Sequence, residues 1–128
     1  SDPNNIFVAE FIGSPKMNII RIDKENILNK NTLKLFENEI KFENIEFDDE
    51  IYLGIRPEDI SLKNNFDIKL TVKVDLVENL GFEKIIYTSY LNNEINIKSS
   101  VDTKEQSLNI SFPKEKVFFF DKDKNRIR

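Results

Sequence analysis

The sequence of 128 residues contains no cysteine and no histidine. Without cysteine the chain forms no disulfide and no thiolate metal site. Without histidine it lacks the most common general base and the most common metal ligand. A Ser-His-Asp or Cys-His catalytic arrangement is therefore excluded. Long apolar runs are also absent, and none approaches the roughly 20 residues that a membrane-spanning helix needs.

Positive charge is not in excess. The chain carries 19 Lys and Arg against 23 Asp and Glu, which gives a net charge of −4. Proteins that bind nucleic acids or anionic membranes are usually basic, because they neutralise phosphates. The 11 phenylalanines offer stacking surfaces for a nucleic-acid-binding barrel. The acidic balance and the lack of a Lys/Arg stripe argue against that alternative, and we expect no nucleic-acid partner.

Glycine is scarce, and the three glycines Gly13, Gly54 and Gly81 lie far apart. None is followed by lysine, so the phosphate-binding Walker loop is absent. We therefore expect no ATP hydrolysis, no cofactor and no catalytic residue in this chain. The acidic runs Asp48-Asp49-Glu50 and Glu58-Asp59 are interpreted as solvated loops. A hard-metal site is the alternative, although their spacing matches no calcium-binding loop.

What is abundant points to β structure. Apolar residues make up 39% of the chain, and Ile and Phe, which favour pleated surfaces, supply most of them. The clearest strand runs over 66–77, where one face carries Ile68, Leu70, Val72, Val74 and Leu76. Further strands are predicted over 17–23, 33–35, 40–47, 51–55, 84–91, 94–98, 108–112, 117–120 and the last residues, with a tight turn at Asn92-Asn93. Short strands separated by turns predict an all-β barrel or sandwich.

The first residues carry the signals of a short helix. Asp2 suits the N-cap and Pro3 the first helical position. The helix is expected to end near Ile12, with Gly13 as a left-handed C-terminal cap and Pro15 preventing its continuation. We expect it to pack on the barrel or on an upstream domain. The chain starts without methionine, which we interpret as the start of a fragment.

Three segments, 7–18, 53–60 and 77–83, carry a resemblance to a known family. In this order and spacing they resemble the C-terminal domain of ATPase subunits of carbohydrate ABC importers, in the class serving maltose, glycerol 3-phosphate and multiple sugars. The motif residues are Gly13, Pro15, Met17, Asn18, Arg56, Pro57, Glu58, Asp59, Glu78 and Gly81. Phe118 to Asp121 resembles the closing motif, although the family often has His-Leu where Phe118 and Phe119 stand here.

The resemblance implies an OB-like β-barrel of the MOP/TOBE type with a short N-terminal helix. It implies one C-terminal accessory domain over 1–128, with 1–15 leading from a nucleotide-binding domain and 16–128 forming the barrel. ATP and Mg²⁺ would bind to that other domain of a transport ATPase. The expected role is regulatory and dimer-supporting, at the cytoplasmic face of the plasma membrane, with a second copy and the importer's transmembrane subunits as partners.

Each motif can be interpreted as structural or, in some cases, as part of an interface. Gly13 to Pro15 is interpreted as a corner between helix and strand. Arg56 either pins the turn that Pro57 begins or reaches across an interface, since its planar guanidinium suits carboxylates and carbonyls. Glu58 and Asp59 suit a helical first turn. The segment 78–81 is a strand end followed by a turn that needs glycine, with an interface role as the alternative.

A small-ligand sensor is the second functional hypothesis. Related barrels in oxyanion importers bind anions through backbone amides and small polar side chains. Ser99, Ser100 and Thr103 lie in a predicted loop and can donate such hydrogen bonds. The ligand would be an oxyanion or a sugar phosphate.

Overall fold

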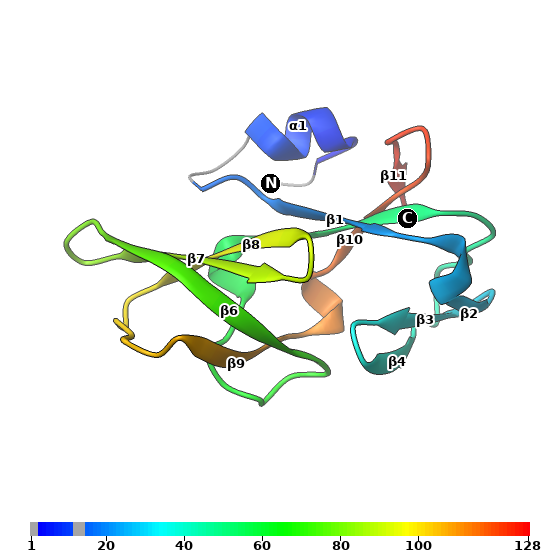
Figure 1. The fold of residues 1–128 in the computed structure, drawn as a ribbon. Helices are drawn as coiled ribbons and strands as arrows, with labels where there is room; N and C mark the ends of the chain where they lie inside the picture. The colour runs from blue at the N-terminus through cyan, green and yellow to red at the C-terminus, as the bar shows by residue number, and fades with distance from the viewer. Residues whose placement is uncertain (1–2, 12–14) are drawn as a thin grey trace.

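The computed structural model describes residues 3–11 and 15–128, which are mostly β-strands (Figure 1). The α-helix and strands are α1 (Ile6–Phe11), β1 (Asn18–Ile22), β2 (Ile27–Asn29), β3 (Thr32–Leu35), β4 (Asn38–Lys41), β5 (Ile51–Ile55), β6 (Ile68–Asn79), β7 (Lys84–Tyr90), β8 (Asn93–Ser99), β9 (Ser107–Phe112), β10 (Phe118–Phe120) and β11 (Arg126–Ile127). Short 3₁₀ helices are η1 (Lys24–Asn26), η2 (Pro57–Asp59) and η3 (Lys114–Lys116). The prediction of an all-β fold with a short N-terminal helix is confirmed, and the arrangement is compatible with an OB-like fold.

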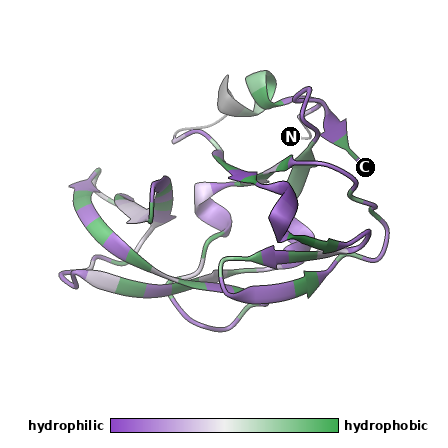
Figure 2. Ribbon diagram, turned by 45° about the vertical axis from the view of Figure 1, so that its right-hand side comes forward, coloured by the Kyte–Doolittle hydropathy of each residue, from purple (hydrophilic) through white to green (hydrophobic). Residues whose placement is uncertain are grey.

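The described strands pair into three antiparallel sheets. Their orders are β1-β5-β10-β11, β2-β3-β4 and β8-β7-β6-β9. Within residues 3–11 and 15–128 these sheets do not close into one hydrogen-bonded ring. Apolar and polar residues alternate along the strands, as Figure 2 shows, so each sheet has one face suited to burial.

One apolar core holds the three sheets together. It includes four fully buried side chains, those of Leu33 and Leu35 from β3, Leu53 from β5 and Ile86 from β7. Phe119 packs edge-on against Phe42 and Phe47, with ring centroids 4.8 and 4.9 Å away. Each such side chain contributes about 1.5–3 kcal/mol when fully buried. Within the described part of the chain, no helix combines the length and apolarity needed to cross a membrane.

A bulge divides β6 and corrects one sequence prediction. Val74 pairs with Thr88 and Leu76 with Tyr87, so two steps along β6 match one step along β7. The extra residue reverses the alternation beyond Val74. Val77 therefore packs against the core, whereas Leu76, which the alternation assigned to the core face, is 61% exposed.

The start of α1 also differs from the prediction. The helix begins at Ile6, and the cap is Asn5, whose Oδ1 accepts a hydrogen bond of 2.8 Å from the Val8 amide. Pro3 precedes the helix, and Asp2 lies outside the described residues. The Ile6 amide donates to the Lys124 carbonyl (3.1 Å), so the tertiary contact with the β10–β11 hairpin sets the start.

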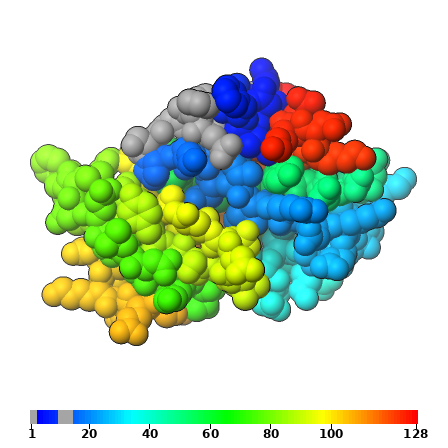
Figure 3. Space-filling model, turned by 45° about the horizontal axis from the view of Figure 1, so that its top comes forward, coloured from blue at the N-terminus to red at the C-terminus, as the bar shows by residue number. Residues whose placement is uncertain are grey.

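The two ends of the described chain lie side by side, as the adjacent blue and red residues in Figure 3 show. Asn5 forms an isolated antiparallel bridge with Asn125. Ile6 and Ala9 of α1 pack with Met17 and Phe120 in a small second core. Of the packing alternatives for the helix, the structure therefore shows packing on the strands of this chain.

Two other predicted elements are shifted. The predicted strand over 40–47, in which an irregularity near Glu43-Asn44 was expected, is interrupted there: β4 ends at Lys41 and a turn follows at 43–44. The tight turn between β7 and β8 contains Leu91 and Asn92, since Tyr90 pairs with Asn93. Leu91 has the positive φ of 53° that the sequence assigned to asparagine.

Candidate functional site

Some of the described motif residues lie near one strand, β8. Asn18 contacts β8 from β1, η2 lies beside β8, and the β6–β7 hairpin adjoins it in the same sheet. These motifs are far apart in the sequence, and the fold brings Asn18 and η2 into contact with β8. Gly13 lies outside the described residues, and Pro15 is half-buried in the turn before β1.

Asn18 joins two sheets with its side chain. Its Nδ2 donates to the Asn96 carbonyl (2.9 Å), and its Oδ1 accepts from the Asn96 amide (2.8 Å). The side-chain amide thus reproduces the paired hydrogen bonds of a strand neighbour. Because Asn18 is only 5% exposed, these bonds are shielded from water. They hold β1 of the first sheet against β8 of the third.

Met17 explains a glycine that sequence reasoning did not single out. A Cβ atom on Gly54 would stand 2.6 Å from Met17 Sδ and 3.1 Å from a ring carbon of Phe120. The thioether therefore occupies the space beside the Gly54 backbone, beneath α1. The sequence signal was the glycine itself, placed inside an apolar strand, which often marks close approach of another group.

The segment Arg56 to Asp59 forms η2 and its N-cap. Pro57 stands at the start of the 3₁₀ helix, as predicted, and the Asp59 amide donates to the Arg56 carbonyl (3.0 Å). The Arg56 guanidinium lies 4.7 Å from the centre of the Phe118 ring. Arg126 lies over the same ring at 4.5 Å. Phe118 thus offers a cation–π surface to two arginines.

The motif in the β6–β7 hairpin consists of a polar pair and a turn. The Tyr87 hydroxyl donates to Glu78 Oε1 (3.1 Å). That hydrogen bond, with partial burial and the glutamate charge, raises the pKa of Tyr87 above its ordinary value of 10.0. Gly81 has φ +93°, which a side chain would disfavour, and its amide donates to Asn79 Oδ1 (3.0 Å).

A cleft of about 280 Å³ joins two of the motifs at the end of β8. Glu58 of η2, Glu83 of the hairpin and the segment Lys98 to Ser100 line it. Lys98 Nζ lies 3.4 Å from Glu83 Oε1. Ser99 Oγ is engaged with Val101, donating to its carbonyl and accepting from its amide, both at 2.9 Å. Thr103 is not part of the lining, and its Oγ1 accepts from the Glu105 amide.

The charges of this cleft disfavour an anionic ligand. Two carboxylates and one ammonium leave a net negative charge, and the ammonium already faces Glu83. An oxyanion would meet like charges there, which raises the free energy of its binding. The three hydroxyl residues predicted to bind an oxyanion are not brought together as one set.

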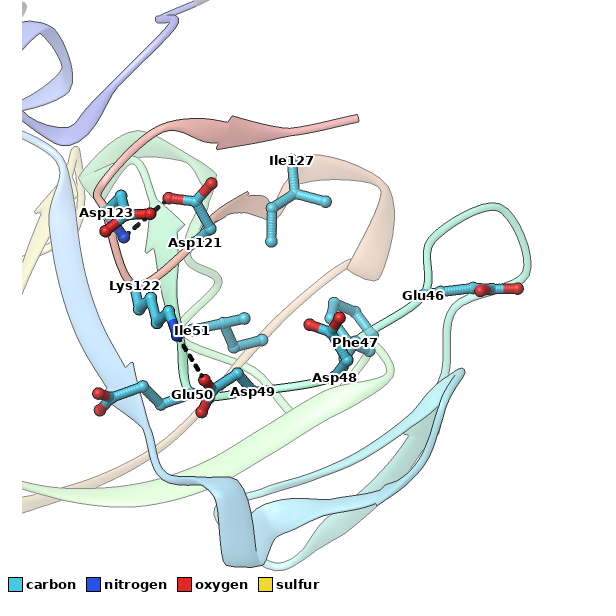
Figure 4. A pocket seen from close by; sticks show the side chains of 10 residues that line it. All are labelled: Glu46, Phe47, Asp48, Asp49, Glu50, Ile51, Asp121, Lys122, Asp123 and Ile127. Carbon is cyan, nitrogen blue, oxygen red and sulfur yellow. Dashed lines mark hydrogen bonds and ion pairs between the residues drawn. The ribbon is translucent and has the colours of Figure 1, made fainter.

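A second cleft, of about 320 Å³, is lined by the acidic loop before β5 and the β10–β11 turn (Figure 4). Lys122 Nζ donates to Asp49 Oδ2 (3.0 Å). The Glu50 amide and then Lys122 lower the pKa of Asp49, while Asp49 raises the pKa of Lys122. Asp121 Oδ1 accepts from the amides of its own turn. Among the described residues, no group of three acidic side chains is placed to hold a metal ion.

Comparison with known proteins finds relatives of one kind. The chain is 39% identical over 62 residues to the xylose/arabinose import ATP-binding protein XacJ of Haloferax volcanii, covering 48% of this chain and 16% of that protein. It is 37% identical over 84 residues to the ABC transporter ATP-binding protein YcjV of Escherichia coli O157:H7, covering 61% and 23%. The maltose/maltodextrin import ATP-binding protein MalK of Aliivibrio fischeri is 34% identical over 82 residues, covering 59% and 22%.

These matches confirm the resemblance to ATP-binding subunits of sugar ABC importers over about half of the chain. The chain spans about a fifth of the length of these relatives. No model of a protein family matches it.

Proposed function

Because this chain is homologous over about half its length to ATP-binding subunits of sugar importers, we propose that it is the regulatory and dimer-supporting part of such a subunit. In this proposal residues 1–128 are one C-terminal accessory domain, in which 1–15 leads from a nucleotide-binding domain and 16–128 forms the β domain. The parent subunit is a transport ATPase on the cytoplasmic face of the plasma membrane, docked to transmembrane subunits.

The observation that carries the proposal is the pairing of this homology with the absence of a phosphate-binding loop. The relatives are named for ATP binding, yet the three glycines here form no Walker sequence. ATP and Mg²⁺ are therefore assigned to a different portion of the parent polypeptide. What this portion offers instead is a β scaffold, in which the Asn18 side chain bonds to β8, Pro57 begins η2 and Gly81 lies in the β6–β7 turn.

The motif residues have scaffold roles in this proposal. Asn18 and Met17 hold the N-terminal segment against the sheets, so a force on the preceding chain reaches the core. Arg56, stacked on Phe118, fixes the approach to η2. Glu78 and Gly81 shape the hairpin that reaches away from the core.

The test uses the parent subunit with and without this portion. We expect the truncated parent to keep its affinity for MgATP, because no nucleotide contact is removed. Without nucleotide, the truncated parent should form a weaker dimer than the complete subunit. Its dimer dissociation constant, measured by sedimentation equilibrium, should therefore be higher. Equal dimer dissociation constants for the two proteins would contradict the dimer-supporting role.

A further inference from the structure

A cleft of about 290 Å³ lies where the second sheet meets the third. The β3–β4 hairpin lies there beside the start of β6 (Figure 1). The Asn38 side chain joins the two sheets, because its Nδ2 donates to the Leu35 carbonyl (2.9 Å) and to the Lys69 carbonyl (2.7 Å). None of the described motif residues lines this cleft, so it is separate from the site around β8.

Part of β6 borders this cleft as an open strand edge. Residues 68–73 pair with β9, whereas the ladder with β7 begins only at Lys73. Within the described residues, the opposite edge of β6 therefore has no strand neighbour over 68–72. Backbone groups of alternate residues point to the same edge of a strand, so the N–H and C=O of Thr71 face the same side as the Lys69 carbonyl. The backbone thus offers the cleft a donor and an acceptor.

Uncharged polar side chains surround this edge. Amides at Asn38, Asn64 and Asn109 and the hydroxyl of Thr71 line the cleft. Thr71 Oγ1 donates to Asn109 Oδ1 (2.7 Å), which leaves the Asn109 amide protons to face a ligand as donors. A side-chain amide carries both donors and an acceptor, so it can bind two neighbouring polar groups of one ligand.

The charges at the cleft cancel. Glu37 and Lys69 carry opposite charges, and the other lining side chains are uncharged. An anion would meet no net positive charge to offset the loss of its hydration, which is costly. A neutral polar ligand loses less hydration and gains hydrogen bonds to the amides. The cleft therefore favours a neutral ligand.

Two half-buried aromatic rings supply the apolar part of the lining. The centroids of Phe36 and Tyr90 lie 5.0 Å apart, with the ring planes at 79°. Phe36 has a φ of 61°, a left-handed conformation that is unfavourable for a bulky side chain. Backbone strain of this kind clusters at ligand sites. Aromatic faces are electron-rich, so they attract the weakly positive C–H groups of a ligand.

We propose that this cleft binds a neutral sugar, either a monosaccharide or one ring of a longer sugar. Neighbouring hydroxyls of a sugar both donate and accept, which matches the amides and the open edge of β6, while its C–H groups suit the aromatic rings. The volume, about 290 Å³, lies at the lower end of small-molecule sites and suits a single sugar ring. The inference does not rest on the dimer-supporting role.

The test is an NMR titration that follows the backbone amide signals of the 128-residue chain. The probes are xylose and maltose, sugars in the names of two relatives. The sugar concentration rises to about 100 mM, because a small open site is expected to have a millimolar dissociation constant. Glycerol is the control probe, since it has hydroxyl groups but no ring.

Two variants remove different parts of the cleft. Tyr90→Leu keeps an apolar side chain and removes the aromatic ring, and Asn64→Ala removes an exposed amide. The matched control is Asn44→Ala, because Asn44 is also exposed but lies in the turn after β4, outside this cleft. Thermal unfolding of each variant verifies that it folds, and the exposure of Asn64 predicts an unchanged midpoint for Asn64→Ala.

We expect both sugars to shift the amide signals of Phe36, Thr71 and Tyr90 in a saturable way. Tyr90→Leu should raise the dissociation constant roughly fivefold or more, as for a lost aromatic contact. Asn64→Ala should raise it roughly threefold or more, as for a lost hydrogen bond. Asn44→Ala should leave it unchanged, and glycerol should give no saturable shift.

Shifts that are absent, that do not saturate or that lie away from the cleft would overturn this inference. The same holds for a dissociation constant that is unchanged in both cleft variants. Glycerol shifts equal to those of the sugars would also overturn it, because they would show that no sugar ring is recognised. Each of these results leaves the dimer-supporting role standing, since that role is tested by the dissociation constant of the parent subunit.

Discussion

At the scale of single residues, the Asn18 side chain joins two sheets through its hydrogen bonds. Both polar ends of its amide bond to the backbone of Asn96, at 2.9 and 2.8 Å. Removing the amide leaves a backbone donor and a backbone acceptor of β8 without these partners. The penalty for such groups is about 1–3 kcal/mol each where water does not reach them.

We therefore predict that Asn18→Ala lowers the free energy of unfolding by about 2–3 kcal/mol, as measured by urea denaturation. The matched control is Asn64→Ala, because Asn64 is exposed. That substitution should change the free energy by no more than about 0.5 kcal/mol. Equal losses in the two variants would show that the bridge from Asn18 to β8 does not stabilise the fold.

The Tyr87–Glu78 pair gives a second prediction at this scale. Glu78 accepts the hydrogen bond of the neutral phenol and repels the phenolate, so the pKa of Tyr87 lies above 10.0. Because the folded pKa is raised, the contribution of this pair is complete below pH 10.0 and is lost as the pH rises through the folded pKa.

We expect Glu78→Gln to lower the pKa of Tyr87, because it removes the negative charge and leaves a weaker acceptor. The pH dependence of the Tyr87 ring signals, followed by NMR, measures the change. Tyr52 serves as the internal control, since it lies in β5, outside the hairpin. A pKa of Tyr87 that is the same in the variant and the natural chain would contradict the assigned cause.

At the scale of elements, the bulge in β6 decides which apolar residues support the fold. Val72 lies before the bulge and is 1% exposed, whereas Leu76 lies beyond it and is 61% exposed. We predict that Val72→Ala lowers the free energy of unfolding by about 2 kcal/mol, while Leu76→Ala changes it by less than about 0.5 kcal/mol. Denaturant unfolding measures both, and similar losses would indicate an unbroken alternation through β6.

The sequence predicted the positions of most strands, because burial of one sheet face imposes a period of two that is visible in residues such as Ile68, Leu70 and Val72. It did not predict the bulge, since Val74, Leu76 and Val77 are all apolar and fit either register. It also misplaced the start of α1. Both Asp2 and Asn5 are good N-caps, and only the contact with Lys124 distinguishes them.

The candidate site was predicted as motifs and not as an arrangement. Pro57 and Gly81 were predicted because their roles depend on local backbone geometry, whereas the close approach of Met17 to Gly54 depends on tertiary packing. The contact of Asn18 and η2 with β8 depends on sheet order, a property of contacts distant in sequence. The exposure of Leu76 was not predicted either, because the bulge that turns this side chain outward leaves no signal in the sequence.

At the scale of the whole molecule, the cleft beside β8 predicts the absence of anion binding. Glu58 and Glu83 both face it, and Lys98 is paired with Glu83. Calorimetric titration with molybdate, phosphate or a sugar phosphate should give no heat beyond dilution. A saturable signal that Lys98→Met abolishes would favour the sensor hypothesis instead.

We have proposed that this chain is part of a longer importer ATPase subunit, and the coding sequence upstream of this segment in the native gene tests that proposal. We expect the reading frame to continue upstream through a domain's length that contains a Walker loop and an ABC signature. A start codon immediately before this segment, with no such domain in frame, would contradict it.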